Sequence, residues 1–328
     1  MIHPVELVKE NKNTSPNLSI IIVNFNGGEY ILDCLKSIEE TISERVEIII
    51  ADNNSTDGSL EKVRSNYPDI TVLENKENVG FACANNIAVK HAKSDFILLL
   101  NPDAKLVTGI SRGLQYIRSN KQIGVLGSKV VFPDGSQQYT MGLELHPLRL
   151  ILSWLGLGRV LPLSIFRRVE LDESRYLQEH TTDWVSGAFI LTRKKVWDRL
   201  NGLDEDFFMY MEDTDFCRRV RDIGLKVVYF PHMVTIHDEG MGRESIEYTS
   251  LSRTFKSYLI YSRKYYGSIG CWQVRIGLTL VMLFRSILYF LFGILLIIRS
   301  GSRYREISSI YLKIIPFLFT KLSKQKIK

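Results

Sequence analysis

The chain has 328 residues, of which 45% are hydrophobic, 24% charged and 11% aromatic, with a mean hydropathy of −0.01. This globular composition has no low-complexity tract, and it excludes wholesale disorder, a collagen-like fibre and a coiled coil. The net charge of +6 is uneven: residues 253–328 carry 14 Lys or Arg and one acid, whereas residues 1–252 carry 28 basic and 35 acidic residues. A mildly acidic body with a basic, apolar tail argues against a nucleic-acid partner and indicates an anionic membrane surface.

The cysteines and the start of the chain indicate the cellular setting. The cysteines are scattered without a C-x-x-C pair, so the sequence supports neither a zinc finger nor a disulfide scaffold. They are Cys34, Cys83, Cys217 and Cys271. The first residues lack a basic segment followed by an apolar one, so we expect no cleavable signal peptide. A reducing, cytosolic setting fits both features.

Strand and helix patterns alternate from residue 18 onward. Residues 18–24 (LSIIIVN) are typical of a strand buried on both faces, and residues 30–40 carry apolar side chains at helical spacing. Further strands are predicted at 46–51, 70–73 and 96–100, with helices at 59–66 and 81–92. We expect Asp57 or Ser59 to cap the second helix. This order predicts an α/β fold with a doubly wound, mostly parallel sheet and right-handed crossovers.

Polar clusters follow three of the predicted strands, at residues 24–28 (NFNGG), 52–58 (DNNSTDG) and 101–104 (NPDA). Ligands bind beyond the carboxyl ends of such strands, so we expect the clusters to meet at one rim. A G-x-G-x-x-G after the first strand and a P-loop motif are both absent from the sequence, which removes support for dinucleotide and P-loop sites. Carboxylates and amides instead suit a nucleoside and a divalent cation carrying a diphosphate. Turn formation or helix capping is the alternative for each cluster by itself.

Six stretches within residues 18–237 together resemble the family 2 glycosyltransferases with the GT-A fold, especially their rhamnosyltransferase-like branch. They are IIIVNFNGGEYILDCLKSI, IIIADNNSTDGS, NKENVGFACANNIAV, FILLLNPDA, WVSGAFILTRKKVWDRLNGLDEDFFMYMEDTDFCRRVRDIGLKVVYFP and VTIH, in the family's order. The resemblance implies a Rossmann-like, mostly parallel sheet with flanking helices. It also implies transfer, with inversion, of a sugar such as rhamnose or another deoxyhexose from a nucleotide diphosphate donor. The implied acceptor is a hydroxyl of a glycan, in particular a lipid-linked glycan in cell-surface polysaccharide assembly.

The resemblance assigns donor-binding residues to the rim. Asp52 corresponds to the family's aspartate that faces the nucleotide base, and a helix cap is the alternative for it. The remaining expected donor residues are Asn24, Asn26, Asn54, Asn85 and Asp103.

The family's metal motif is often D-x-D, whereas this chain has Asn101-Pro102-Asp103. Only Asp103 can supply a charged oxygen. One carboxylate with diphosphate oxygens and waters is sufficient for Mg²⁺ or Mn²⁺, so we expect weak metal binding before the donor arrives. His237 matches a family position that completes the metal shell through an imidazole nitrogen. A turn after proline and an ordinary histidine are the respective alternatives.

Acidic residues 212–215 (EDTD) open a predicted helix. By family position Asp213 is the general base that takes the acceptor proton. Glu212 or Asp215 would orient the acceptor or the helix. Favourable charge at the start of a helix is the alternative explanation for these acids.

Residues 184–188 (WVSGA) resemble the family segment that lines the donor sugar and the acceptor. Gly187 and Ala188 would let a ligand approach the backbone closely, and Trp184 would stack on a sugar face. Packing of a small-residue strand against a helix is the alternative.

Residues 276–298 are apolar, small or hydroxyl-bearing except for Arg285. As a helix they would measure about 34 Å, enough to span a hydrocarbon core of about 30 Å. The central arginine costs about 2.5 to 3.5 kcal/mol on insertion. The alternatives are therefore a helical hairpin or interfacial helix followed by an amphipathic stretch at 307–322, and a plain hydrophobic core. Either membrane mode predicts a protein at the cytoplasmic face of the cell membrane, peripheral or anchored by its C-terminal segment.

The expected domains are an N-terminal extension at 1–17, a catalytic domain at 18–250 (nucleotide-binding half 18–132, acceptor half 133–250) and a basic, membrane-associating helical segment at 251–328. The apolar residues 147–168 are expected to form a lid or a surface that dips into the membrane.

Two other functions are compatible with such a fold. One is a binding or scaffold protein that has lost the chemistry, and both Asp103 and Asp213 argue against it. The other is a nucleotidyltransferase, which would need a basic triphosphate loop near the first strand. Residues 24–30 contain no Lys or Arg.

Overall fold

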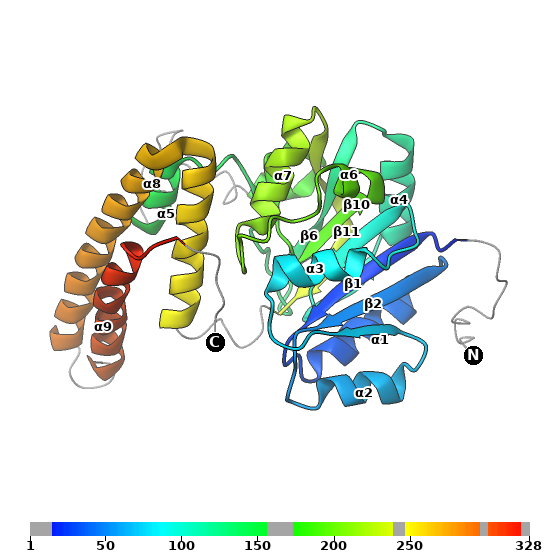
Figure 1. Ribbon diagram of the computed structural model, residues 1–328, viewed down its shortest axis with the longest axis horizontal. Coiled ribbons are helices and arrows are strands. Elements are labelled where there is room, and N and C mark those ends of the chain that lie inside the picture. Colours follow the sequence, from blue (N-terminus) through cyan, green and yellow to red (C-terminus); the bar gives the residue numbers. More distant parts are fainter. Residues whose placement is uncertain (1–14, 156–172, 239–246, 296–300, 323–328) are drawn as a thin grey trace. The chain divides into compact units, whose positions relative to one another are not determined.

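The computed structural model describes residues 15–155, 173–238, 247–295 and 301–322. These residues fold into two compact units (Figure 1). The sheet unit contains described residues 15–144, 173–205 and 212–238, and the helical unit contains 145–155, 206–211, 247–295 and 301–322. The expected boundary at residue 250 stays a prediction, and most of the expected N-terminal extension lies outside the described residues.

The sheet unit alternates strands and helices along its first half. Its elements are β1 (Leu18–Asn24), α1 (Tyr30–Thr41), β2 (Val46–Asp52), α2 (Ser59–Asn66), β3 (Thr71–Glu74), α3 (Phe81–Val89), β4 (Phe96–Leu100), β5 (Ala104–Thr108), α4 (Ile110–Ser119), β6 (Ile123–Val131), β7 (Met141–Gly142), a 3-10 helix (Glu173–Leu177), β8 (His180–Thr182), β9 (Trp184–Val185), β10 (Phe189–Arg193), α6 (Lys194–Arg199), α7 (Glu212–Asp222) and β11 (Lys226–His237). The strands and helices predicted up to residue 100 begin and end within three residues of these bounds.

The main sheet has the strand order β3-β2-β1-β4-β10-β6-β11-β5, with β8 paired to β11. β1 is parallel to β2 and β4, β2 is parallel to β3, and β6 is parallel to β11. β10 runs antiparallel to both β4 and β6. The predicted α/β fold with a mostly parallel sheet and flanking helices is therefore confirmed.

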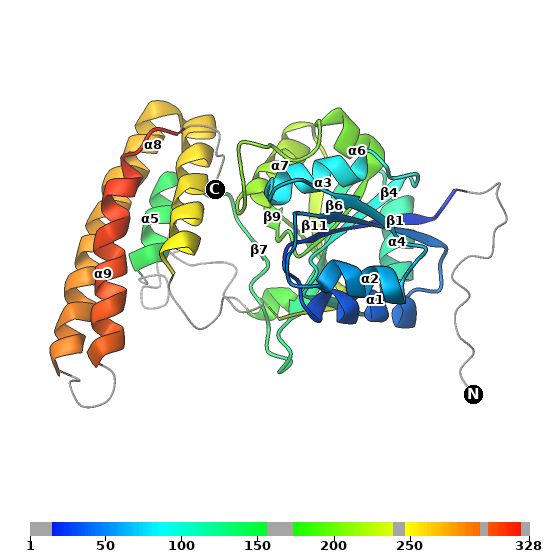
Figure 2. The same ribbon diagram turned by 60° about the horizontal axis from the view of Figure 1, so that its bottom comes forward.

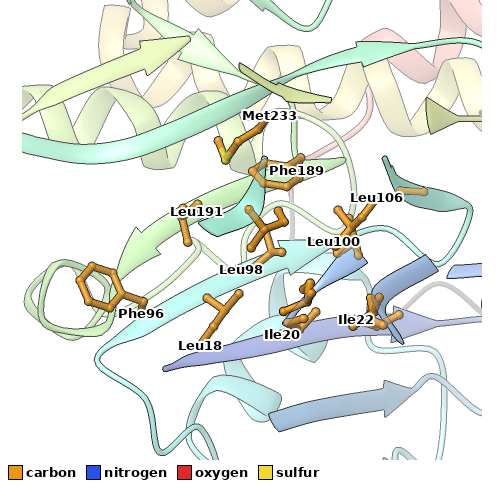
Figure 3. Packing of buried hydrophobic residues seen from close by; sticks show 14 of the residues in the cluster. Leu18, Ile20, Ile22, Phe96, Leu98, Leu100, Leu106, Phe189, Leu191 and Met233 are labelled. Carbon is orange, nitrogen blue, oxygen red and sulfur yellow. The ribbon is translucent and has the colours of Figure 1, made fainter. Parts of the chain in front are cut away.

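Helices cover both faces of this sheet because both faces are apolar. Leu18, Ile20 and Ile22 of β1 pack with α1, α2 and α4, whereas Ile21 and Val23 pack with α3, α6 and α7. Figure 2 shows these two helix layers above and below the strands. Figure 3 shows the first cluster, in which Leu98 and Leu100 of β4 lie between the β1 side chains and Phe189 and Leu191 of β10. Alternate residues of a strand point to opposite faces, which explains the continuous apolar run of β1.

The start of α2 differs from the prediction. Gly58, not Asp57 or Ser59, is the N-cap residue, and its φ of 78° is a left-handed conformation that glycine adopts without a steric penalty. The Asp57 carboxylate instead accepts hydrogen bonds from the Ser59 amide at 3.1 Å and from the Gly28 amide at 2.8 Å. It therefore links the start of α2 to the loop after β1.

The helical unit consists of α5 (Pro147–Leu155), α8 (Tyr248–Leu295) and α9 (Gly301–Leu318). α8 is kinked at Gly267, whose φ of 66° and ψ of −164° are not helical. Buried apolar side chains from all three helices form its core: Leu150, Leu259, Leu278, Met282 and Ile314 are among them. In Figures 1 and 2, α9 runs alongside the second half of α8.

Two predicted apolar segments lie partly in this unit. Residues 147–155 form α5, and the remainder of the expected lid lies outside the described residues. The stretch 276–298 is helical as far as Leu295, and its last residues are also outside them. Within the described part of the chain, one helix is long and apolar enough to cross a membrane, judged only by length and composition: α8 over Tyr248–Ile294.

Candidate active site

The carboxyl ends of β1 and β2 bring Asn24 and Asp52 together. The parallel register pairs the two residues, and Asn24 Nδ2 donates to Asp52 Oδ1 at 2.8 Å. The Ser55 amide donates to Asp52 Oδ2 at 2.9 Å, and the Ser55 hydroxyl donates to Oδ1 at 2.7 Å. Asp52 thus holds the loop that follows it, while Oδ2 keeps a lone pair that can accept a ligand hydrogen bond.

Asn24 is completely buried and positions its neighbours. Its amide nitrogen also lies within hydrogen-bond distance of the hydroxyls of Ser55 at 3.1 Å and Ser59 at 3.0 Å. A Cβ at Gly27 would lie 2.4 Å from Asn24 Oδ1, so glycine is needed at this close approach. These contacts fix the orientation of Asp52, and a direct contact between Asn24 and a nucleotide stays a prediction.

The other predicted donor asparagines lie in two different environments. Asn26 and Asn54 are exposed and have left-handed backbones, with φ of 53° and 64°. Asn26 Oδ1 accepts from the Thr56 amide at 2.8 Å, so the loops after β1 and β2 are joined at the rim. Asn85 is buried in α3 and donates to the Phe81 carbonyl at 2.9 Å. Its donor-binding role stays a prediction.

Asp103 and His237 form a close pair on neighbouring strands. His237 pairs with Ala104 across β11 and β5, and His237 Nε2 lies 3.1 Å from Asp103 Oδ1. Asn101 Nδ2 is 3.2 Å from the same imidazole nitrogen. In the part of the chain that the structure describes, no group of three or more His, Cys, Asp or Glu gathers as a metal cage. The pair offers two protein ligands, so other ligands would have to come from substrate and water.

Gln138 holds the Nδ1 proton of His237, and no pattern in the sequence marks this residue. Its Nε2 donates to the His237 carbonyl, so its Oε1 is the atom that lies 3.0 Å from His237 Nδ1. An amide oxygen only accepts, so Nδ1 carries a proton, and in the neutral imidazole Nε2 presents a lone pair. Two acceptors, Nε2 and Asp103 Oδ1, then face each other at 3.1 Å. Such a pair is favourable when it shares a positive charge, which a proton on Nε2 or a bound divalent cation supplies.

Asp213 lies in the first turn of α7 and is held by backbone donors. The Gly187 amide donates to Asp213 Oδ2 at 2.8 Å, and the Thr214 amide donates to Oδ1 at 2.6 Å. Burial raises the pKa of the Asp213 carboxyl, although these hydrogen bonds lower it in part. A carboxylate with a raised pKa is a stronger base at neutral pH than an exposed one.

Glu212 is a buried acid next to Asp213 in the sequence. It is 5% exposed, and its Oε2 has no hydrogen-bond partner among the described residues. Burial, followed by the nearby charge of Asp213, raises the pKa of Glu212 well above its ordinary value. Asp215 is also buried, and it forms an ion pair with Arg219 at 2.7 Å. The first turn of α7 is therefore acidic at a place where charge is poorly solvated, which favours a site over simple capping.

The segment after β9 connects Asp213 to the Asp103–His237 pair. The Asn101 amide donates to the Ala188 carbonyl at 3.2 Å, and the neighbouring Gly187 amide holds Asp213. A Cβ at Gly187 would meet Phe81 and Asp213 at ordinary contact distances of 3.5 and 3.6 Å. Protein packing does not require glycine there, and the close approach of a ligand at Gly187 stays a prediction.

The Trp184 side chain makes contacts with the residues of β7 and the loop that follows it. Its indole nitrogen donates to the Leu143 carbonyl at 3.1 Å, and its ring lies against Gly142, where a Cβ would come within 2.8 Å. The indole thus supports the strand that precedes Gly187. Stacking of Trp184 on a sugar stays a prediction.

The sheet and the polar rim define the class of this protein as a GT-A glycosyltransferase. Residues 19–200 match the sequence model of glycosyl transferase family 2, and residues 150–322 match that of glycosyl transferase family group 2. The chain belongs to glycosyl transferase family 2, and its rhamnosyltransferase-like character, predicted from the six stretches, is confirmed by its relatives.

Two curated relatives are rhamnosyltransferases. An N-acetylglucosaminyl-diphospho-decaprenol L-rhamnosyltransferase of Mycobacterium tuberculosis is 26% identical over 80% of this chain and 89% of its own length. Rhamnosyltransferase WbbL of Escherichia coli K12 is 26% identical over 66% of this chain and 82% of its own length. Among solved structures, a mannosyltransferase of Pyrobaculum calidifontis in complex with GDP-Man and Mn²⁺ has a TM-score of 0.52 at 15% identity, covering 94% of this chain and 88% of its own. That likeness concerns the fold.

Proposed function

We propose that the protein is an inverting glycosyltransferase that moves a sugar, such as rhamnose or another deoxyhexose, from a nucleotide diphosphate donor to a lipid-linked acceptor. The observation that carries this proposal is the hydrogen-bonded path from Asp103 and His237 through Asn101, Ala188 and Gly187 to Asp213. It joins a cation-binding pair and a base in one site. The names of the two rhamnosyltransferase relatives support rhamnose as the transferred sugar. One of these names also gives a diphospho-decaprenol acceptor.

In this proposal Asp213 is the general base. The acceptor oxygen attacks the anomeric carbon of the donor while its proton passes to an oxygen of Asp213. The bond between the anomeric carbon and the diphosphate oxygen breaks on the opposite face, so the configuration inverts. The Gly187 and Thr214 amides hold the carboxylate in place during this transfer. Glu212 orients the acceptor from the adjacent position.

Asp103 and His237 would hold a divalent cation, Mg²⁺ or Mn²⁺, together with diphosphate oxygens. When bound, the cation supplies charge stabilisation for the departing nucleoside diphosphate. Gln138 keeps the Nε2 lone pair of His237 directed at that position, as a hydrogen-bonded neighbour of a metal ligand does. Asp52 and the loop asparagines would receive the nucleoside.

The second half of α8 has the polarity expected for contact with lipid. Its outward stripe is apolar and 46 to 62% exposed: Ile276, Leu280, Phe284, Ile287, Leu291 and Ile294. Its charged groups face inward instead. Arg285 donates to the Trp154 carbonyl at 2.8 Å and to the Tyr311 hydroxyl at 3.1 Å, and Arg275 donates to the Leu318 and Thr320 carbonyls. Arg285, whose charge argues against insertion into a membrane, therefore has hydrogen-bond acceptors within the helical unit.

α9 favours a helical unit that lies in the membrane surface. Its Arg303, Arg305, Glu306 and Lys313 side chains are exposed. Glu306 and Lys313 are separated by about 10 Å along a helix, far less than the hydrocarbon thickness of about 30 Å. An exposed face with charges this closely spaced suits headgroups and water. We therefore propose peripheral association with the cytoplasmic face of the membrane through the apolar stripe of α8.

Release of nucleoside diphosphate from a panel of nucleotide sugars tests the proposed activity. The purified protein should hydrolyse or transfer from one of them, and excess chelator should abolish the reaction. Asp103→Ala should lose most of it, whereas Asp134→Ala, at an exposed turn of the sheet unit, should keep it. Nucleotide binding without turnover of any donor would instead support the scaffold alternative.

A further inference from the structure

Two cations on the first half of α8 have no anionic partner among the described residues. Lys256 is 8% exposed, and no described residue forms a hydrogen bond or ion pair with it. Arg253 lies with its guanidinium 5.3 Å from the centre of the Phe208 ring, and its buried Nε has no hydrogen-bond partner in the described part of the chain. Residues three apart on a helix share a face, so the two cations are neighbours.

Among the described residues, this arrangement is favourable for an anion. A buried charge without a counter-ion loses hydration, and proteins pair such groups or bind an ion there. Burial lowers the pKa of the Lys256 ammonium, and no described carboxylate offsets that effect. The aromatic contact of Arg253 compensates part of its charge, and it leaves the donors of the guanidinium available.

The same face of α8 supports a strained segment. Ser257 Oγ donates to the Met209 carbonyl at 2.9 Å, and the hydroxyls of Tyr210 and Ser250 lie 3.4 Å apart. Tyr210 and Met211 have φ of 69° and 72°, which non-glycine residues adopt only where packing enforces it. Met211 is bonded to Glu212, so this segment leads directly into the turn that carries the proposed base.

We infer that Arg253 and Lys256 bind the diphosphate of an isoprenoid-diphosphate-linked acceptor. The inference rests on the proposed function and names the group by which that acceptor is recognised. Two cations less than one helical turn apart match two adjacent anionic phosphates. The apolar stripe that we assign to lipid lies further along the same helix, which is where an isoprenoid tail in the membrane would lie. A phospholipid headgroup shares the phosphate chemistry and is distinguished by the test.

Direct binding tests the site without requiring turnover. The full chain in neutral detergent micelles is titrated calorimetrically with farnesyl diphosphate, and with farnesol as the uncharged probe. We expect Lys256→Met and Arg253→Gln each to weaken farnesyl diphosphate binding about tenfold to a hundredfold, because each removes a charge-assisted contact. Arg263→Gln and Lys313→Met remove the same charges at exposed positions and should bind as the wild type does.

Three further measurements decide between explanations. Lys256→Met should melt at no lower temperature than the wild type, since it removes a charge that no described carboxylate compensates, so lost binding would not reflect unfolding. Saturating nucleoside diphosphate should leave farnesyl diphosphate bound, and displacement would place the probe in the donor site and overturn the inference. Binding to phosphatidylcholine vesicles containing phosphatidylglycerol should be equal for Lys256→Met and the wild type. A selective loss for Lys256→Met would make the site a headgroup site.

The inference and the proposed function fail separately. If all four variants bind farnesyl diphosphate equally, the acceptor site is wrong even when the wild type transfers sugar. If Lys256→Met and Arg253→Gln lose binding while the wild type transfers no sugar from any donor, the anion site stands and the proposed reaction is wrong. In an active protein, the two variants should raise the KM for the isoprenoid acceptor and leave the KM for the donor unchanged.

Discussion

Replacement of Asp213 by asparagine tests the proposed base with little change of shape. The wild-type carboxylate accepts from the Gly187 amide at 2.8 Å and from the Thr214 amide at 2.6 Å. Asparagine offers one oxygen and one donor, so only one of these bonds survives. An unsatisfied buried amide costs about 1 to 3 kcal/mol, and removal of a poorly solvated charge offsets part of that cost. We therefore expect Asp213→Asn to fold with a modest loss of stability.

Turnover should fall much further than stability. Loss of a general base reduces the rate by about 10² to 10⁴, so kcat should drop by that factor while the dissociation constant for the donor nucleotide stays nearly unchanged. The assay is acceptor-dependent release of nucleoside diphosphate at saturating donor, with calorimetric titration of the nucleotide. Asp222→Asn, at the exposed end of the same helix, is the matched control and should be fully active. Full turnover by Asp213→Asn would refute the assigned base, and equal loss of turnover and nucleotide affinity would indicate a structural role.

Three other predictions concern the cation site, the buried acid Glu212 and the lipid face of α8. Asp103→Ala should abolish stimulation of turnover by Mg²⁺ or Mn²⁺ in a metal titration, and an unchanged metal response would remove Asp103 from the cation site. Glu212→Gln should raise the free energy of unfolding by about 1 kcal/mol or more in urea at pH 7, because a pKa raised by folding makes the wild type lose stability as pH rises above about 4. The gain should vanish near pH 4, and a gain independent of pH would contradict this cause. Leu280→Glu, at a position 62% exposed on α8, should release the protein from anionic vesicles, whereas Leu312→Glu on α9 should not, and equal retention of both in flotation would contradict the assigned lipid face.

The fold of the sheet unit was predictable because its signals are local. Strands buried on both faces, such as residues 18–24, need a continuous apolar run, and helices over such a sheet need apolar residues at helical spacing. The acids of residues 212–215 were also visible, because they follow an aromatic segment and precede a helical pattern. Their assignment as base and orienting residue came from the family resemblance.

Features that depend on long-range contacts were not predictable. Gln138 sets the tautomer of His237 from 99 residues away, and nothing around it in the sequence marks that role. The partners of Arg285 come from α5 and α9, so the sequence showed an isolated charge where the structure has one with hydrogen-bond partners.

The cap at Gly58 is a local feature that the prediction missed, because Asp57 and Ser59 on either side are stronger capping residues by type.

The anomeric configuration of the product tests the proposed mechanism most directly. The donor identified in the panel is incubated with the protein, a divalent cation and an isoprenoid-diphosphate-linked acceptor, and the new glycosidic linkage is assigned by proton NMR. Direct attack assisted by Asp213 predicts one added sugar whose anomeric configuration is opposite to that of the donor. Retention of the donor configuration would contradict single displacement with Asp213 as the base, and absence of any transfer product from every donor that binds would contradict the enzymatic proposal itself.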